Sequence, residues 1–183
     1  MSNTNKKNIK TATLAGGCFW CIEGAFNQVK GISSAISGYM GGQTTSPTYE
    51  DICSGETGHA EVVQLSFDTD LISYQEILEI FFTLHDPTQL NRQGNDIGTQ
   101  YRSAIFYHDQ SQKEIAEAVI TEMENDKVFD QGIVTQVCAD ETFYSGEKYH
   151  QDYVNNNPEN QYCQAVVSPK LAKFRKTFVS KLK

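Results

Sequence analysis

The run from Gly16 to Cys21 places a thiol directly after two glycines and beside the chain's only tryptophan. Apolar residues before this run predict a strand and those after it predict a helix, so Cys18 should lie at the start of the helix. Backbone N–H groups at a helix start stabilise negative charge, and we therefore expect Cys18 to ionise more readily than an ordinary buried thiol. The glycines permit a sharp turn that leaves the sulfur approachable. We interpret Cys18 as a nucleophile rather than a small packing residue.

Cys21 forms a Cys-x-x-Cys spacing with Cys18, which suits either a redox disulfide or half of a metal site. Zinc would need two further ligands, and the available side chains form no second close pair: His59, Cys53, Cys138 and Cys163. No metal is therefore predicted, and Cys53 and Cys138 are interpreted as packing residues.

Two aromatic residues, Phe19 and Trp20, separate these cysteines. They could anchor the helix to the core, which is the common role of buried aromatic rings. Beside a nucleophile they could equally line a small apolar pocket that holds a methyl or thioether group. The sequence does not decide between these two interpretations.

A carboxylate and two phenols could complete such a site. Glu61 falls on the apolar side of a strongly alternating segment, so burial should let it keep its proton to higher pH and act as an acid. A carboxylate at a strand end that reaches solvent or a lysine is the alternative. Tyr49 and Tyr101 lie in two long predicted loops and could donate hydrogen bonds to a ligand oxygen.

Alternation and helical periodicity predict the elements that must position these side chains. Strands are expected at 9–15, 32–39, 61–67, 103–107 and 135–138, and helices at 18–29, from the Ser73 cap to Leu84, from the Asp109 cap to Asn125, and from Ser168–Pro169 to Leu182. Long loops are expected at 41–58 and 87–100. The order strand, helix, strand, strand, helix, strand predicts a ferredoxin-like split βαβ two-layer α+β sandwich with long inserted loops.

Length and composition limit the function classes. The 183 residues suit one catalytic domain, with residues 1–9 flexible and residues 155–183 forming a C-terminal extension with a basic helix docked on the core. A net charge of −8 argues against nucleic-acid binding. The polar opening segment predicts neither a signal peptide nor a membrane span, so we expect a cytoplasmic protein whose five cysteines are mostly reduced.

Five motifs, taken together and in order, resemble those of type A peptide-methionine sulfoxide reductases. The resemblance extends from about Thr11 to beyond Cys163 and rests on these segments: GGCFW at 16–20, SPTYEDICSG at 46–55, GHAEVV at 58–63, GTQYRS at 98–103 and YHQDY at 149–153. It implies a thiol enzyme without metal or nucleotide that reduces the S epimer of methionine sulfoxide, free or in oxidised proteins, to methionine.

The resemblance also implies roles for individual residues. Cys18 attacks the sulfoxide sulfur, Glu61 protonates the departing oxygen, and Tyr49 and Tyr101 hydrogen-bond that oxygen. Asp96 matches a family position that helps to bind the substrate backbone or a water molecule.

By the same analogy, Phe19 and Trp20 hold the S-methyl group. The resulting Cys18 sulfenic acid must condense with a second thiol to form a disulfide that thioredoxin or a similar dithiol reduces. Cys163, on a polar and movable C-terminal segment, resembles the family's resolving cysteine, while Cys21 is the rival and could accept the disulfide in a relay.

Two other function classes stay open on the residues alone. One is a general thiol-disulfide oxidoreductase or peroxide-responsive protein that uses Cys18 and Cys21. The other is a non-catalytic module that binds methionine or zinc. The enzyme interpretation, with a monomeric chain and no cofactor, is the one we carry forward.

Overall fold

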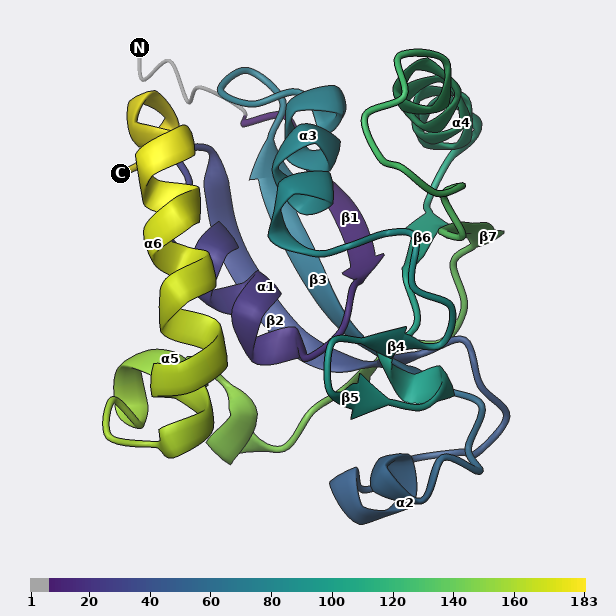
Figure 1. Ribbon diagram of the computed structural model, residues 1–183, viewed down its shortest axis with the longest axis vertical. Helices are drawn as coiled ribbons and strands as arrows, with labels where there is room; N and C mark the ends of the chain where they lie inside the picture. The colour runs from purple at the N-terminus through teal and green to yellow at the C-terminus, as the bar shows by residue number, and fades with distance from the viewer. Residues whose placement is uncertain (1–6) are drawn as a thin grey trace, which may run out of the picture.

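The computed structural model describes residues 7–183 and is built around a six-stranded sheet (Figure 1). Neighbouring strands run antiparallel, except for one parallel pair at an edge of the sheet, so the sheet is mixed. The predicted α+β class is confirmed. The strands follow one another across the sheet in this order: β7 (Gln136–Ala139), β6 (Ala104–Tyr107), β1 (Ile9–Ala15), β3 (Ala60–Asp68), β2 (Ile32–Met40) and β8 (Tyr144–Ser145).

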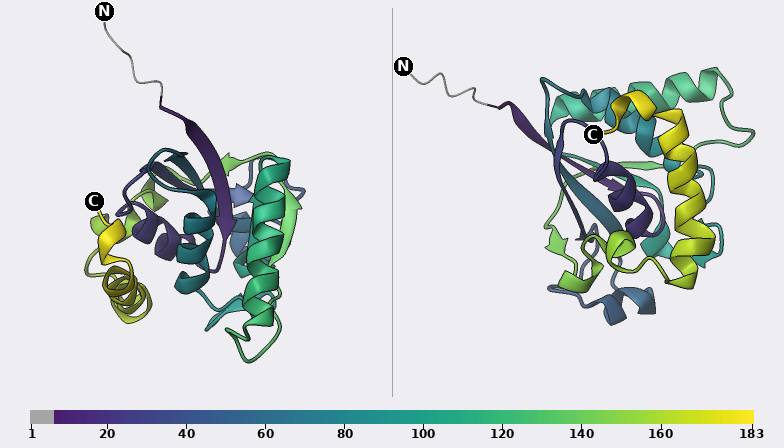
Figure 2. Two further views of the ribbon diagram at one scale, coloured as in Figure 1. Left: turned by 90° about the horizontal axis from the view of Figure 1, so that it is seen from above. Right: turned by 90° about the vertical axis from the view of Figure 1, so that its left-hand side faces the viewer.

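Helices α1 (Phe19–Phe26), α3 (Tyr74–Leu84) and α6 (Ser168–Thr177) contact one another on one face of the sheet, and α4 (Gln110–Asn125) lies beside α3 (Figure 2). The main hydrophobic core fills the space between these helices and the strands. A smaller cluster around Met40, Val62 and Phe106 lies on the opposite face. Burial of these two apolar surfaces is the main stabilising contribution of the fold.

Two helix starts match their sequence signals. Ser73 and Glu76 form the predicted capping box, in which each side chain accepts the other residue's backbone N–H. Asp109 caps α4 by accepting the Gln112 N–H at 2.8 Å. Both caps satisfy backbone donors that the first helical turn leaves free.

The long predicted loops contain short elements that the sequence reading missed. Within 41–58 lies α2 (Tyr49–Ser54), which begins at a capping box formed by Thr48 and Asp51. Within 87–100 lie a second small sheet and a 3₁₀ turn: β4 (Arg92–Gln93), β5 (Asp96–Ile97) and η1 (Thr99–Tyr101). The predicted helix at 18–29 is also shorter, since α1 ends at Phe26.

The C-terminal part differs most from expectation. After η2 (Lys148–His150) and α5 (Tyr153–Asn156), a π-helical turn η3 (Cys163–Val167) runs directly into α6, where the Ser168 N–H bonds to the Cys163 carbonyl. Ser168 and Pro169 therefore continue a helix instead of starting one. The helix ends at Thr177, and after η4 (Val179–Lys181) Leu182 pairs with Val29 in an isolated bridge.

No helix within residues 7–183 combines the length and apolar character that a membrane crossing requires. The prediction of a flexible segment at 1–9 falls mainly on residues 1–6, which lie outside the described residues; Ile9 is already part of β1.

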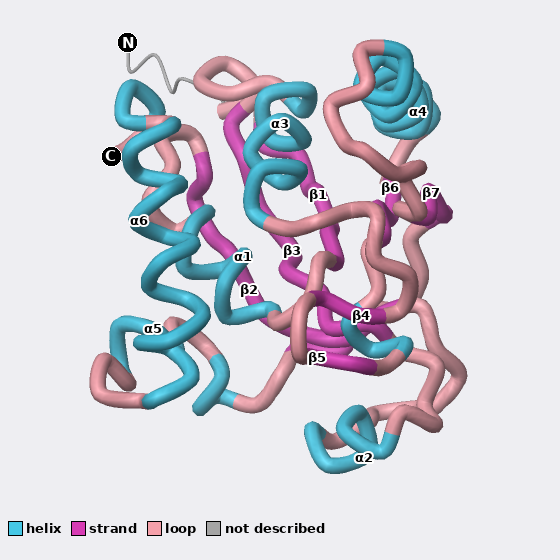
Figure 3. Tube along the Cα trace, viewed as in Figure 1, coloured by secondary structure: helices cyan, strands magenta, loops and turns pink. Residues whose placement is uncertain are grey.

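The segments that form the site meet at one end of the sheet, where several strands begin or end. The end of β1, the start of β3, the end of β2 and the start of β6 meet there, as the register pairs Leu14 with Val63, Met40 with Ala60, and Ala15 with Ala104. Figure 3 shows loops at this end of the sheet, where α1 begins and α2 and η1 lie. Segments distant in sequence can therefore surround the start of α1.

Candidate active site

Cys18 is the N-cap residue of α1, which confirms its predicted position at the strand-to-helix junction. Gly17 has φ +86°, a conformation that side chains rarely adopt, and a Cβ there would lie 2.8 Å from Gln93. Both facts explain why glycine precedes the cysteine. The turn leaves Cys18 9% exposed at the wall of a cavity.

The cavity has a volume of about 130 Å³ and brings together side chains from five separate parts of the chain. It is lined by Cys18, Trp20, Tyr49, Glu61, Asp96, Tyr101 and Tyr162. The predicted nucleophile, acid, phenols and aspartate are therefore neighbours. Its size suits a small group such as a side-chain terminus.

The resting Cys18 is a thiol, contrary to the expectation that the helix start would favour its ionisation. Burial, a hydrogen bond with Cys21 and the nearby Glu61 raise the pKa of Cys18 well above its ordinary value, and the Trp20 backbone N–H only partly opposes this. Desolvation of the sulfur thus outweighs the helix terminus. For Cys21 the hydrogen bond with Cys18 acts in the other direction and lowers the pKa. The hydrogen bond between the two thiols therefore links their ionisation, and burial is the main cause of the raised Cys18 pKa.

Glu61 lies on β3, is 2% exposed, and accepts the Phe19 backbone N–H at 3.2 Å. Burial raises its pKa to about 8, while the Phe19 N–H acts against this rise and the charges of Asp96 and Cys21 add to it. The predicted buried carboxyl group is confirmed. At neutral pH it holds a proton inside the cavity.

Tyr49 and Tyr101 reach the cavity from short helices, not from irregular loops. Tyr49 is the first residue of α2 and Tyr101 the last of η1. Burial, followed by the charge of Glu61, raises the pKa of both phenols. Both hydroxyl groups therefore stay protonated and can donate hydrogen bonds to a bound oxygen.

Asp96 begins β5 and accepts a hydrogen bond from the Tyr162 hydroxyl at 2.5 Å. This contact links the small sheet to the C-terminal segment across the cavity. Burial is the largest cause that raises the pKa of Tyr162. Tyr162 was not singled out from the sequence, although an aromatic residue directly before Cys163 was a usable signal.

The two aromatic residues of the cysteine motif have different surroundings. Trp20 lines the cavity, and its ring stacks on Tyr153 with centroids 3.7 Å apart and planes 3° from parallel. Phe19 is buried below the cavity against Tyr39 and His150 and is absent from the lining. Of the two interpretations that the sequence leaves open, Phe19 therefore has the core-anchoring position, while Trp20 lines the cavity.

The remaining cysteines are free thiols in this structure. Cys163 is buried at the first residue of η3 and does not line the cavity, whereas the polar residues before it, 157–161, are exposed or half-buried. Burial and the charge of Cys21 raise the pKa of Cys163. Cys53 is exposed on α2, which corrects its interpretation as a packing residue, whereas Cys138 packs partly against the smaller cluster.

His150 is a second residue that the sequence reading left without a role. It is fully buried, and its Nδ1 accepts the Trp20 indole N–H at 3.2 Å. It belongs to the YHQDY motif, so its position was available in the sequence while its contact was not. Across residues 7–183, no three His, Cys, Asp or Glu side chains are grouped so that they could hold a metal ion.

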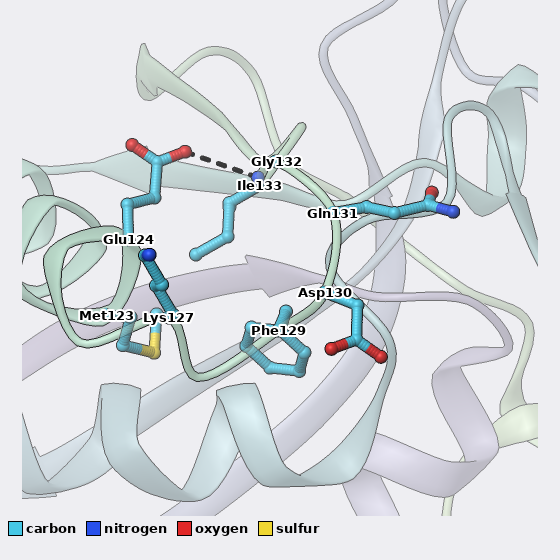
Figure 4. A pocket seen from close by; sticks show the side chains of 8 residues that line it. All are labelled: Met123, Glu124, Lys127, Phe129, Asp130, Gln131, Gly132 and Ile133. Atoms are coloured by element: carbon cyan, nitrogen blue, oxygen red, sulfur yellow. Dashed lines mark hydrogen bonds between the residues drawn. The ribbon is translucent and has the colours of Figure 1, made fainter.

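A larger hollow of about 400 Å³ lies at the end of α4 (Figure 4). Its lining comes from one continuous stretch, in which Glu124 accepts the Ile133 N–H at 3.2 Å. The lining contains no cysteine or histidine. It consists of Met123, Glu124, Lys127, Phe129, Asp130, Gln131, Gly132 and Ile133. Of these two, only the smaller cavity contains a nucleophile and a buried acid, so chemistry and not volume identifies the site.

Comparison with known proteins identifies the same family that the sequence motifs resemble. The family model described as "Peptide methionine sulfoxide reductase" matches residues 10–182. A peptide methionine sulfoxide reductase MsrA of Saccharolobus solfataricus is 54% identical over 96% of this chain and 98% of its own, and that of Natronomonas pharaonis is 52% identical over 94% and 97%.

Solved structures agree. The crystal structure of Mxr1 from Saccharomyces cerevisiae in reduced form has a TM-score of 0.77 and 32% identity, covering 89% of this chain and 95% of that one. Methionine sulfoxide reductase A of Corynebacterium diphtheriae has a TM-score of 0.73 and 32% identity, covering 85% and 78%. With the family model spanning nearly the whole chain, this protein belongs to the peptide methionine sulfoxide reductase (MsrA) family.

Proposed function

We propose that the cavity beside α1 reduces the sulfoxide of oxidised methionine, free or within proteins, with Cys18 as nucleophile and Glu61 as acid. The observation that carries this proposal is that a thiol and a carboxyl group with a pKa of about 8 line the same small cavity. Family membership supports the reaction, which is thiol-dependent reduction of methionine sulfoxide.

In the proposed step, the Cys18 sulfur attacks the sulfoxide sulfur as Glu61 gives its proton to the oxygen. The transient bond between the two sulfurs and the substrate S–O bond then break as the oxygen passes to the Cys18 sulfur, so methionine leaves and Cys18 carries a sulfenic acid. The thiol proton of Cys18 replaces the one that Glu61 donated. The substrate sulfur gains two electrons and the Cys18 sulfur loses two, so atoms and electrons balance.

Tyr49 and Tyr101 are proposed to hydrogen-bond the oxygen, which becomes more basic as the S–O bond weakens. Their hydroxyl groups share the cavity with Glu61, which supports this role. Asp96 is proposed to orient the substrate backbone or a water molecule, and its bond from Tyr162 fixes its carboxylate for that task.

Trp20 is proposed to contact the S-methyl group, with Phe19 supporting it from below. The flat ring, held by its stack on Tyr153, supplies the apolar wall of a cavity whose remaining lining is polar. With the methyl group against the ring and the oxygen against the phenols, two of the three groups on the substrate sulfur have fixed places. We propose that this is the basis of selectivity for the S epimer.

Regeneration is proposed to pass through a disulfide that a dithiol such as thioredoxin reduces. One relative, Mxr1 of Saccharomyces cerevisiae, was solved in complex with Trx2, at 25% identity and a TM-score of 0.54. Cys21, hydrogen-bonded to Cys18, can condense with the sulfenic acid without large movement. Cys163 can accept the disulfide afterwards, since the charge of Cys21 already acts on it. Its burial at a π-helical turn means that η3 must open first.

The test is Cys18→Ser, assayed with thioredoxin and with each epimer of methionine sulfoxide. We expect a loss of turnover of about a thousandfold or more, because the serine hydroxyl is a far weaker nucleophile at neutral pH. Cys138→Ser, which removes a partly buried thiol outside the cavity lining, is the matched control and should keep near-normal turnover. Retained turnover in Cys18→Ser would exclude Cys18 as the nucleophile.

The hydrogen-bonded pair of Cys18 and Cys21 supports a second candidate function, general thiol-disulfide exchange. Faster turnover of small disulfides or peroxide than of sulfoxides would favour it. A buried acid is not needed for that chemistry, so Glu61 supports the sulfoxide reaction instead.

We also propose the ferredoxin-like description for the core. The antiparallel order β6, β1, β3, β2, with α1 and α3 on one face, supports it, and β7 and β8 extend the sheet at its two edges. A single catalytic domain with a C-terminal extension, a monomeric state and a cytoplasmic location, without nucleic-acid or membrane partners, complete the proposal.

A further inference from the structure

Glu147 collects hydrogen bonds from three parts of the chain around the cavity. Its Oε1 accepts the Tyr39 hydroxyl at 3.2 Å, and its Oε2 accepts the Tyr49 backbone N–H at 3.2 Å and the Tyr149 hydroxyl at 3.0 Å. Tyr39 belongs to β2 and Tyr49 begins α2, so the carboxylate joins the sheet to the helix that carries a cavity phenol. Glu147 does not itself line the cavity.

His150 extends this network to Trp20. The indole N–H can only donate, so the His150 Nδ1 that receives it at 3.2 Å must be unprotonated. Burial lowers the pKa of His150, which keeps the ring neutral and places its one proton on Nε2.

The Nε2 atom has no hydrogen-bond partner, although the residue is fully buried. A buried donor without an acceptor is destabilising, and such groups in native proteins call for an explanation. The Glu147 Oε2 lies 3.7 Å from this Nε2, slightly beyond hydrogen-bond distance. The Tyr49 and Tyr149 rings pack against the imidazole, with ring centroids 4.4 and 4.2 Å from its own.

We propose that Glu147 is a positioning residue: its carboxylate selects the Nε2–H tautomer of His150, which leaves Nδ1 free to fix the Trp20 indole, and it anchors the start of α2 that carries Tyr49. One carboxylate thereby positions two lining residues of the cavity, Trp20 and Tyr49. The inference rests on the proposed function only for its kinetic consequence, since the tautomer and the indole contact exist without substrate.

The test uses Glu147→Gln, which keeps the side-chain shape and removes the charge. Glu117→Gln, on an exposed position of α4, is the matched control. The chain has one tryptophan, so the Trp20 indole gives a single N–H signal by NMR, and the His150 ring nitrogens are assigned by their loss in His150→Gln.

In Glu147→Gln we expect a mixture of His150 tautomers, a shifted and faster-exchanging Trp20 indole signal, and a fall of about tenfold in kcat/KM for the sulfoxide, mostly through KM. Glu117→Gln should match the unmodified protein in all three. If Glu147→Gln does not fold, Glu147→Asp, which keeps the charge but retracts it, should show the same changes in smaller measure.

An unchanged tautomer and indole signal in the folded variant would overturn the proposal, as would lower thermal stability with neither signal altered, because that is the mark of a merely structural contact. The NMR signals do not depend on turnover. Failure of the sulfoxide reaction itself would therefore appear separately, as an unmodified protein that is inactive.

Discussion

The cavity beside α1 is smaller than the hollow at the end of α4, but it contains the side chains that can do chemistry. The hollow has about 400 Å³ and the cavity about 130 Å³, but the hollow is lined by one local stretch, whereas the cavity is lined by side chains that the fold brings together from distant segments. Its acid is 2% exposed and keeps its proton. Convergence and desolvation, not room, distinguish a site that can do chemistry.

The largest effect is expected when the acid of the cavity is removed while its shape is kept. Glu61→Gln retains an acceptor for the Phe19 N–H but has no proton to transfer, and we expect single-turnover reduction of methionine sulfoxide to slow by about 10²- to 10³-fold. Rapid-quench measurement of methionine formed per enzyme checks this result.

The same variant separates two explanations, because Glu61 is protonated at neutral pH and its replacement by Gln changes no charge beside Cys18. If formation of the Cys18 thiolate limited the reaction, the rate of reduction would therefore stay unchanged. A faster or unchanged rate would thus contradict the acid role.

The pH dependence of stability tests the desolvation of Glu61. Its pKa is about 8 in the folded chain against about 4.3 when unfolded, so between these values the folded state holds a proton that the unfolded state has lost. Stability should therefore decrease as pH rises from about 4 to 8, by on the order of a few kcal/mol for this group. Glu23, whose pKa burial raises to about 7, adds a decrease in the same direction that ends earlier.

Denaturant unfolding of the unmodified protein and Glu61→Gln across this range measures the effect. The difference between the two curves isolates Glu61, and the variant should lose less stability as the pH rises. Its remaining pH dependence combines the decrease from Glu23 with an opposite contribution from His85, whose pKa burial lowers to about 4. Parallel curves for the two proteins would mean that Glu61 is not desolvated as described.

A smaller effect is expected from one phenol. Tyr101→Phe removes a single donor to the departing oxygen but leaves the ring in place, so kcat/KM should fall by about tenfold. Steady-state kinetics with both Tyr101→Phe and Tyr107→Phe, whose ring lies on β6 outside the cavity lining, checks the specificity of the loss. Equal losses in both variants would remove Tyr101 from the site.

The smallest effect is expected at the hollow. Phe129→Ala enlarges it further without touching the cavity residues, so kcat/KM should stay within about twofold while stability falls by about 1 kcal/mol or more. A large kinetic loss in a folded Phe129→Ala protein would show that the two regions are not independent.

Much of the frame was predictable because its signals are local. The alternation around Glu61, the Ser73 and Asp109 caps, and the glycines before Cys18 each act within a few residues, and β3, α3, α4 and the α1 start lie where these signals place them. The α2 helix was missed although Thr48 and Asp51 form a capping box, since the helix is too short to show periodicity.

The features that could not be predicted depend on tertiary contacts. Whether Cys18 ionises is decided by burial from segments distant in sequence, which outweighs the local helix terminus. The contact of Tyr162 with Asp96 and the stack of Trp20 on Tyr153 likewise follow from where the fold places the C-terminal segment. Spacing along the chain contains no information about either.

The most direct test of the central claim traps the oxygen on its sulfur. A chain with Cys21→Ser and Cys163→Ser, fully reduced and given one equivalent of methionine S-sulfoxide with dimedone and no reductant, is analysed by peptide mass spectrometry. We predict about one methionine formed per chain and a dimedone adduct on Cys18 alone. Methionine formed with Cys18 unmodified, or with the adduct on Cys53 or Cys138, would contradict the account.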